Sequence, residues 1–156
     1  MQHYEHARNG YRISTDKQLL NIAVIMQYLS DESYWAKDIP QALVERSIEH
    51  SLCFGVYEGT AQIGFARVVT DKATFAYLAD VFILPEWRGQ GLSKWLMEVV
   101  LAHPDLQGLR RWLLATMDAH GLYTQFGFTP LTEPERMMQR KAQHTYSELK
   151  QLNANT

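Results

Sequence analysis

The stretch from residue 75 to residue 103 constrains the fold more than any other part of the sequence. Residues 75–84 form an apolar run without polar alternation, which predicts a strand buried on both faces. A loop with two glycines follows, Arg88-Gly89-Gln90-Gly91, and apolar residues then recur at helical spacing over 91–103. A buried strand, a glycine loop and an amphipathic helix in this order predict a layered α/β architecture.

The other elements follow from hydrophobic periodicity and from breaks at Gly, Pro and charged residues. The predicted strands are 11–14, 52–58, 61–70, 75–84, 110–117 and 127–131, with 136–140 as a last edge strand, and the predicted helices are 16–30, 40–49, 91–103 and 119–126. Thr15-Asp16-Lys17-Gln18 fits a capping box, which sets the start of the first helix. Three consecutive strands predict an antiparallel meander, so we expect an α/β (mixed α+β) fold with a mostly antiparallel sheet flanked by helices.

The length and the absence of linker-like segments predict one domain. The chain has 156 residues and shows no internal repeat, low-complexity run or Pro/Gly/Ser-rich linker. We expect a single domain over 1–156, with a core over 11–140 and a polar tail that frays from Gln143.

Charge and cysteine content exclude several classes of protein. With 15 Lys+Arg against 17 Asp+Glu, the net charge of −2 argues against a nucleic-acid partner held by phosphate neutralisation. No run of about 18 apolar residues is present and the N-terminus is polar, so we expect no membrane partner and a cytoplasmic location. The sole cysteine, Cys53, is expected to be a buried hydrophobe, with a nucleophile as the alternative. The six histidines have no metal-ligand spacing, so we expect no metal.

The glycine loop has the composition of an anion cradle. Glycines let a ligand approach the backbone closely, and the following helix start supplies unpaired N–H groups and a partial positive charge. Together they favour a phosphate or pyrophosphate. The alternative interpretation is a plain strand-turn-helix in which the glycines serve geometry alone.

This loop resembles motif A of the GNAT superfamily of acetyl-CoA-dependent N-acetyltransferases, through Arg88, Gly91 and Ser93. The resemblance implies that the backbone amides of the loop hold the pyrophosphate of coenzyme A, at Arg88, Gly89, Gln90, Gly91, Leu92, Ser93 and Lys94. It also implies that the backbone of Val81, Phe82 and Ile83 pairs with the pantetheine arm and the acetyl group.

A second segment, Leu122-Tyr123-Thr124-Gln125-Phe126-Gly127-Phe128, resembles the family's motif B. The resemblance implies that Tyr123 lies on a short helix beside the thioester sulfur. It also places Thr116 where the family often has an Asn that hydrogen-bonds the cofactor. The resemblance covers most of the chain and implies the GNAT fold, with acetyl-CoA as co-substrate and no metal.

Two residues are candidates for proton transfer. A phenol is protonated at pH 7, so Tyr123 can donate to a developing thiolate, and the alternative is a tyrosine that only packs. Asp80 interrupts the buried strand and is the base candidate, because desolvation raises the pKa of a carboxyl. The alternatives are a structural carboxylate bonded to the backbone or to Arg67, and a proton relay through water.

An aromatic pair between the first two helices is the candidate acceptor site. In the family the loop that holds Tyr34 and Trp35 borders the acceptor, and these rings suit stacking on an aromatic or cationic molecule. Ordinary packing beneath a loop is the alternative.

These observations together predict an N-acetyltransferase. We expect direct attack by a primary amine of a small molecule on acetyl-CoA, and a homodimer is compatible with the sequence. The alternative functions are a non-catalytic acyl-CoA-binding sensor of the same fold and an anion-binding domain for another nucleotide.

Overall fold

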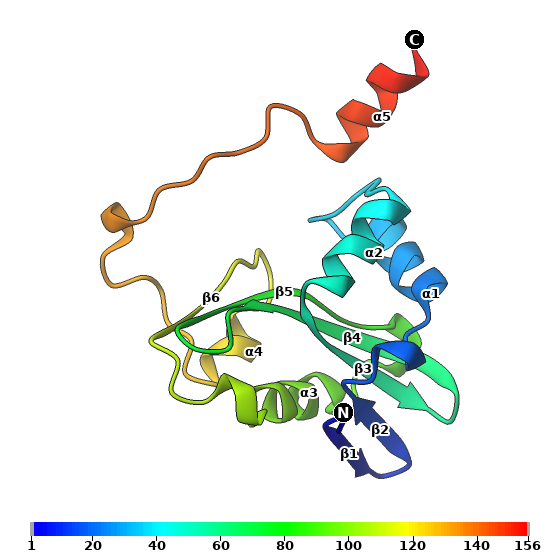
Figure 1. Ribbon diagram of the computed structural model, residues 1–156, viewed down its shortest axis with the longest axis vertical. Helices are drawn as coiled ribbons and strands as arrows, with labels where there is room; N and C mark the ends of the chain where they lie inside the picture. Colours follow the sequence, from blue (N-terminus) through cyan, green and yellow to red (C-terminus); the bar gives the residue numbers. More distant parts are fainter. Residues whose placement is uncertain (1, 156) are drawn as a thin grey trace.

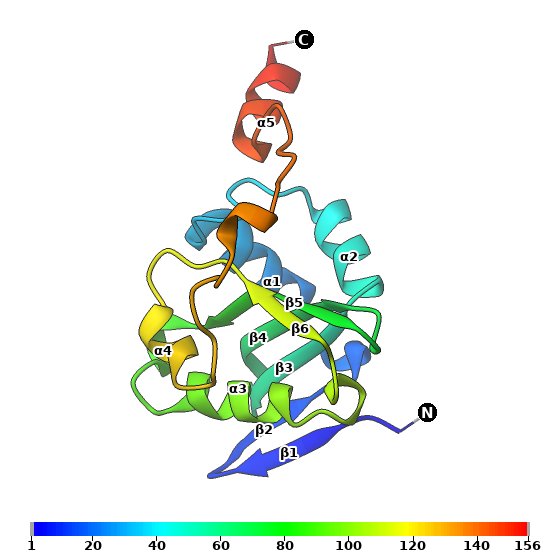
Figure 2. The ribbon, with the colours of Figure 1, turned by 90° about the vertical axis from the view of Figure 1, so that its left-hand side faces the viewer.

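The computed structural model describes residues 2–155. A six-stranded sheet, in the order β1-β2-β3-β4-β5-β6, separates two layers of helices (Figure 1). The helices α1 (Ile22–Gln27) and α2 (Gln41–Glu49) cover one face, and α3 (Leu92–Leu101) and α4 (His120–Thr124) cover the other (Figure 2). The arrangement confirms the predicted mixed α+β fold.

The sheet is antiparallel except at one edge. Its strands are β1 (Glu5–Arg8), β2 (Tyr11–Ser14), β3 (Leu52–Glu58), β4 (Ala61–Thr70), β5 (Phe75–Ile83) and β6 (Arg111–Leu114). β3, β4 and β5 form the predicted meander, and β6 runs parallel to β5 after the crossover through α3. Consecutive antiparallel strands need short turns, whereas the parallel pair needs the helical crossover.

A buried cluster on each face holds the helices to the sheet. Leu96 and Val100 of α3 pack with the inner residues of the sheet on one face. Ile25 and Val44, from α1 and α2, pack with Phe82 of β5 on the other. β5 is therefore covered on both faces, which explains its uninterrupted apolar run.

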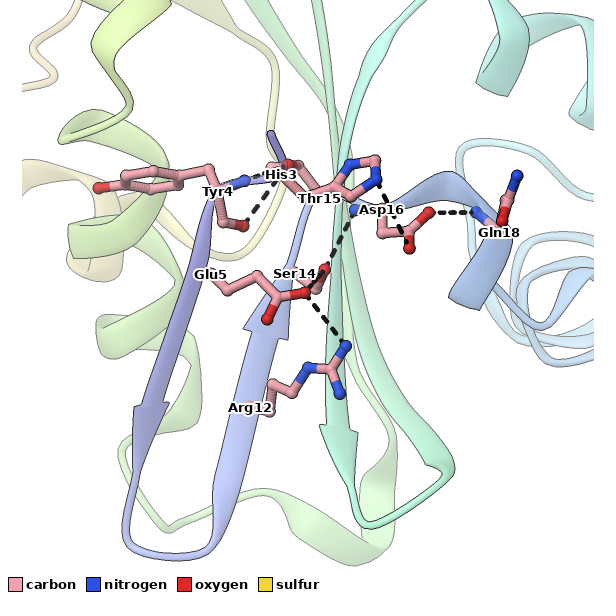
Figure 3. A network of polar contacts seen from close by, with 8 residues as sticks. All are labelled: His3, Tyr4, Glu5, Arg12, Ser14, Thr15, Asp16 and Gln18. Atoms are coloured by element: carbon pink, nitrogen blue, oxygen red, sulfur yellow. Dashed lines mark hydrogen bonds and ion pairs between the residues drawn. The ribbon is translucent and has the colours of Figure 1, made fainter. Parts of the chain in front are cut away.

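The helix predicted over 16–30 forms only in its second half, and the predicted start is wrong. The chain makes a short 3₁₀ turn at Lys17–Leu19 and α1 begins only at Ile22, because the Asn21 side chain accepts a hydrogen bond from the Val24 N–H at 3.2 Å. The Thr15 hydroxyl, expected to cap the helix, instead accepts from the Tyr4 N–H at 2.9 Å (Figure 3). Thr15 therefore joins the ends of β1 and β2, and Asp16 caps the 3₁₀ turn.

The first hairpin was missing from the prediction. β1 pairs with β2 through a two-residue turn, Asn9-Gly10, in which both residues have positive φ (52° and 83°). Asn-Gly is the preferred pair for such a turn. All four side chains of β1 are exposed, so its pattern carries no alternation that would reveal a strand.

The C-terminal third differs most from expectation. β6 and α4 form inside the predicted 110–117 and 119–126, but no strand forms at 127–131 or 136–140, where the structure has loops and a 3₁₀ turn at Pro134–Arg136. The tail expected to fray holds the helix α5 (Tyr146–Ala154), because the Thr145 hydroxyl caps it by accepting from the Glu148 N–H at 3.1 Å. An extended arm joins α4 to α5 (Figure 1).

Candidate active site

β5 and β6 separate towards the carboxyl end of β6. Their pairing covers Phe75–Leu78 of β5 and Arg111–Leu114 of β6, and β5 then continues to Ile83 without a neighbour on that edge among residues 2–155. A cavity of about 420 Å³ lies at this opening. The backbone of β5 beyond Leu78 therefore has, in the described part of the chain, an edge without a partner strand, and this segment includes residues 81–83.

A β-bulge in β5 sets the direction of Asp80. Ala66 of β4 pairs with Val81 of β5, and Val68 pairs with Leu78. One residue lies between the paired positions on β4 and two lie between them on β5, so β5 carries one extra residue. A bulge of this kind redirects a side chain. The buried Asp80 side chain meets Arg67 of β4 in this region.

Both carboxylate oxygens of Asp80 already have donors. Arg67 Nε lies 2.8 Å from Oδ2, and Trp35 Nε1 donates to Oδ1 at 2.8 Å. Arg67 also donates to the Ser51 hydroxyl at 3.0 Å. The ion pair with Arg67 is the contact expected if Asp80 is a structural carboxylate. Trp35 was not expected as a partner, since it lies 45 positions from Asp80 in the sequence.

Tyr34 and Trp35 line one side of the cavity, and we call this aromatic pair the roof of the cavity. The Tyr34 hydroxyl accepts from the Met117 N–H at 2.9 Å, in the loop after β6, while Trp35 binds Asp80 in β5. The two rings meet edge to face, with centroids 5.1 Å apart. The pair therefore bridges the two separating strands at the edge of the cavity.

Tyr123 lies at the inner wall of the same cavity. It belongs to α4 and is 9% exposed, and its ring meets Phe128 edge to face at 5.9 Å. Burial raises the pKa of Tyr123 to about 12, and nearby Tyr34 and Asp118 add to the shift. The hydroxyl therefore keeps its proton at neutral pH and can donate it.

Thr116 shapes the start of the helix that carries Tyr123. Its hydroxyl accepts from the Ala119 N–H at 3.0 Å and from the Asp118 N–H at 3.4 Å. These bonds order the turn that leads into α4. Thr116 also lines the cavity, so the position expected to contact the cofactor is present at the site.

The loop before α3 presents free backbone amides to open space. Gly89 and Gly91 have φ of +83° and +78°, and a Cβ added at either would meet no atom within 4 Å. The first bond within α3 runs from the Trp95 N–H to the Gly91 carbonyl. The N–H groups of Leu92, Ser93 and Lys94 thus lack partners within the helix, and Gly91 offers no capping side chain. This arrangement suits an anion.

The side chains of Arg88 and Gln90 are used within the protein. Arg88 donates to the Ile83 carbonyl at 3.0 Å and to the Tyr28 hydroxyl at 2.9 Å, which ties the loop to the end of β5. The Gln90 side chain accepts from the Tyr11 hydroxyl at 2.6 Å. Both residues hold the loop in place, so anion contacts fall to its backbone.

Tyr28 is a site residue that sequence reasoning missed. Its ring stacks on Phe82 with centroids 4.1 Å apart, and its hydroxyl holds Arg88. The Phe82 side chain is thereby buried, which leaves the backbone of this strand segment for a ligand. Tyr28 lies 60 positions from Arg88, and no local pattern signals such a contact.

The described residues contain neither a metal-ligand cluster nor a helix that could span a membrane. Within residues 2–155, no three His, Cys, Asp or Glu side chains gather as metal ligands would. None of the helices in this range combines the length and the apolar character needed to cross a bilayer.

Comparisons with known proteins agree on one family. Residues 21–128 match the acetyltransferase (GNAT) family. A fungal protein from Gibberella zeae, described as an acetyltransferase, is 36% identical, and the match covers 74% of this chain and 77% of the relative.

Solved structures show the same relationship. A GNAT-family structure from Xanthomonas campestris pv. campestris is 57% identical with a TM-score of 0.87, over 90% of this chain and 99% of that one. A GNAT family acetyltransferase from Elizabethkingia anophelis with acetyl-CoA bound has a TM-score of 0.60 at 12% identity, over 85% of this chain and 88% of that one. At this identity the second likeness concerns the fold alone.

Proposed function

The chain belongs to the acetyltransferase (GNAT) family, and on this premise we propose that it transfers an acetyl group from acetyl-CoA to a primary amine of a small molecule. The observation that carries the proposal is the placement of three features relative to β5. A free edge of β5 and the protonated Tyr123 border the place where β5 and β6 separate, and the free amides at the start of α3 follow the end of β5 along the chain.

The fit of acetyl-CoA rests on the backbone. The amides of Leu92, Ser93 and Lys94 suit its pyrophosphate, since the space over Gly89 and Gly91 is open. The free edge of β5 at residues 81–83 suits the amide groups of the pantetheine arm. When bound, acetyl-CoA supplies the activated acyl group, so the protein needs to provide only orientation and proton transfer.

We assign the general acid to Tyr123. Burial favours its neutral form, so the proton stays on the hydroxyl until negative charge develops beside it. Among residues 2–155, no group hydrogen-bonds the Tyr123 hydroxyl, which leaves it free to donate to a leaving thiolate. The Thr116 turn and Phe128 fix the position of the tyrosine.

We assign Asp80 an orienting role and route the amine proton through water. Both carboxylate oxygens of Asp80 already accept hydrogen bonds, one from Arg67 and one from Trp35. Asp80 thereby holds Trp35 and Arg67 in place at the cavity. The aromatic rings of the roof and the Asp118 carboxylate suit a small cationic amine. The bound amine loses its proton to water and then attacks the acetyl group of acetyl-CoA.

Two measurements test the proposal in sequence. Acetyl-CoA at a hundred times its Kd stabilises a protein by about 2.7 kcal/mol, which raises Tm by roughly 5 to 10 °C for a chain of this size, whereas NADH should give no shift. A panel of small primary amines should then release thiol from acetyl-CoA. Equal stabilisation by NADH would overturn the cofactor assignment. Tight binding of acetyl-CoA without thiol release for any amine would favour a non-catalytic acyl-CoA sensor.

A further inference from the structure

Large apolar side chains that remain exposed gather around the cavity at the opening between β5 and β6. Tyr34, Trp35, Tyr77 and Met117 all line it, and each is between 36% and 74% exposed. Tyr77 comes from β5 and Met117 from the loop after β6, so several elements contribute to this apolar surface. An exposed apolar patch beside a cavity is typical of a ligand site.

Val69 extends this apolar surface beyond the cavity. Val69 of β4 pairs with Tyr77 of β5 and is itself 41% exposed. Directly opposed residues on neighbouring strands put their side chains on the same face and within contact range. Val68 packs in the cluster under α3, so Val69 points to the other face, where α1 and α2 leave it uncovered. We call the exposed apolar residues of this region, Tyr34, Trp35, Tyr77, Met117 and Val69, the apolar rim.

The charged side chains of the cavity leave one negative charge uncompensated. The charged residues that line it are Arg67, Asp80 and Asp118. Arg67 and Asp80 form an ion pair at 2.8 Å, and Arg67 also donates to the Ser51 hydroxyl at 3.0 Å. The Asp118 carboxylate has no ion-pair partner in the part of the chain that the structure describes. The cavity therefore offers a place for one cationic nitrogen and, among these lining residues, no free cation for a carboxylate.

The uncompensated charge lies near the proposed proton donor. Burial is the main cause of the raised pKa of Tyr123, and the Tyr34 hydroxyl and the charge of Asp118 add to it. An electrostatic effect of this kind requires proximity, so Asp118 is close to Tyr123. Val69 does not line the cavity and adjoins it through Tyr77. The site thus has a polar end at Asp118 and Tyr123 and an apolar end at Val69.

We propose that the acceptor is an amphipathic monoamine, with one primary amino group at Asp118 and an alkyl or arylalkyl body that crosses Tyr77 towards Val69. The inference rests on the proposed acetyl transfer and names the class of its acceptor. The ammonium group pairs with Asp118 and loses one proton to water, and its nitrogen then forms the new C–N bond as the C–S bond breaks. Tyr123 gives its proton to the sulfur and regains one from the nitrogen, so one proton in total reaches the solvent.

Two other classes of acceptor fit the site less well. A diamine would bring a second ammonium group against the apolar rim, where the described residues that line the cavity offer no second uncompensated carboxylate. An amino acid would bring a carboxylate to a cavity whose cation among residues 2–155, Arg67, already binds Asp80 and Ser51. Removing either charge from water without a partner is costly, whereas burying methylene groups is favourable. The rim therefore selects for an apolar body.

Calorimetric titration of three six-carbon amines tests the proposal. Hexylamine, 1,6-diaminohexane and 6-aminohexanoate share a chain and differ in the end group. Titration into the complex with CoA, which carries no acetyl group, measures their binding without reaction. Hexylamine should bind at least about tenfold more tightly than the other two. From propylamine to hexylamine, each added methylene should lower Kd by up to about fourfold. With acetyl-CoA, kcat/KM for thiol release should follow the same order.

Val69→Asp should change the preference among these amines. A carboxylate at the apolar end supplies the partner that a second ammonium group lacks. The affinity for hexylamine relative to 1,6-diaminohexane should therefore fall at least about tenfold. Val69 is exposed, so the fold should tolerate the substitution. Leu19→Asp adds the same charge at an exposed apolar position on the 3₁₀ turn after β2, and it should leave the relative affinity unchanged.

The outcomes separate this inference from the proposed function. Equal affinity for the three six-carbon amines, or an affinity that does not rise with chain length, would overturn the acceptor class. An unchanged relative affinity in Val69→Asp would also overturn it, because the body of the acceptor would then lie elsewhere. Binding in the expected order without thiol release from acetyl-CoA would uphold the class of amine that binds and refute acetyl transfer.

Discussion

The indole N–H of Trp35 donates to Asp80 at 2.8 Å, on the carboxylate oxygen that Arg67 leaves free. One carboxylate thus fastens the loop after α1 to β5. The Arg67 and Asp80 side chains are 17% and 10% exposed, so the pair lies mostly out of water. Removing one member of such a pair leaves an uncompensated charge, which costs more than the pair contributes.

Asp80→Asn should therefore lower the free energy of unfolding by about 3 kcal/mol, because Arg67 loses its counter-ion in a largely buried place. Urea denaturation measures the change. The double variant Asp80→Asn with Arg67→Met also removes the guanidinium that has lost its counter-ion, and it should recover part of the lost free energy of unfolding. If the double variant is no more stable than the single one, the ion pair is not the source of the effect.

A negative charge introduced at the start of α3 tests whether the free amides there bind the pyrophosphate of acetyl-CoA. Gly91→Glu should weaken acetyl-CoA binding by at least about 100-fold, since a carboxylate would occupy the space over free amides. Gly108→Glu is the matched control, because Gly108 also has positive φ and open space above it but lies beyond α3. Calorimetric titration of both variants should separate backbone strain from loss of the cradle. Equal affinity in the two variants would place the pyrophosphate elsewhere.

Tyr34→Phe tests the roof over the cavity. The change removes the bond from the Met117 N–H and keeps the ring, so acetyl-CoA affinity should persist. A lost hydrogen bond of about 1 kcal/mol should raise KM for the amine roughly fivefold. Tyr4→Phe, just before β1, removes a hydroxyl from a residue that does not line the cavity and should leave KM unchanged. An unchanged KM in Tyr34→Phe would reduce the roof to loop packing.

His103 predicts how stability responds to acid. Burial lowers the pKa of His103 below its usual 6.5, and its Nδ1 accepts from the Asp105 N–H at 3.0 Å. The unfolded chain therefore binds the proton more readily, and stability should fall as pH drops below about 6.5. In His103→Asn, whose side-chain oxygen can still accept from the same N–H, this part of the pH dependence should disappear. Guanidinium denaturation between pH 5 and pH 8 would reveal a persistent slope if another group caused it.

Local pattern predicted the elements whose neighbours are adjacent in sequence. β3, β4 and β5 follow one another and pair in that order, so their β-branched and aromatic content and the breaks between them were enough to place them. α3 has one wide apolar face, which periodicity detects. The glycines of the loop were informative because two positive-φ residues before a helix have few uses besides close approach of a ligand.

Local sequence pattern could not predict hydrogen-bond partners that lie far apart in the sequence. The Arg88 guanidinium binds the Tyr28 hydroxyl and the Ile83 carbonyl, and no local pattern indicates the contact with Tyr28. Thr15 looked like a helix cap, yet the N–H of Tyr4 uses its hydroxyl. Each outcome depends on a partner that the fold supplies. The strand expected at 136–140 is the same case, since strand character does not specify which edge a strand joins.

The raised pKa of Tyr123 bears on how activity should depend on pH. A hydroxyl with a pKa of about 12 remains protonated throughout the ordinary assay range. Loss of its proton should therefore cause no fall in kcat below about pH 11. Any basic limb measured between pH 8 and pH 10 should persist in a variant that lacks the hydroxyl.

Tyr123→Phe is that variant. It keeps the ring contact with Phe128, so the fold and the affinity for acetyl-CoA should persist. Loss of a general acid raises the barrier only where thiolate charge develops, and kcat should fall by roughly 10²- to 10⁴-fold. Since the proton is present at every assay pH, the loss should be the same at pH 7 and pH 9.5. Single-turnover thiol release measures it without interference from product release. A variant that reacts at the full rate would leave Tyr123 a packing residue and require another proton donor.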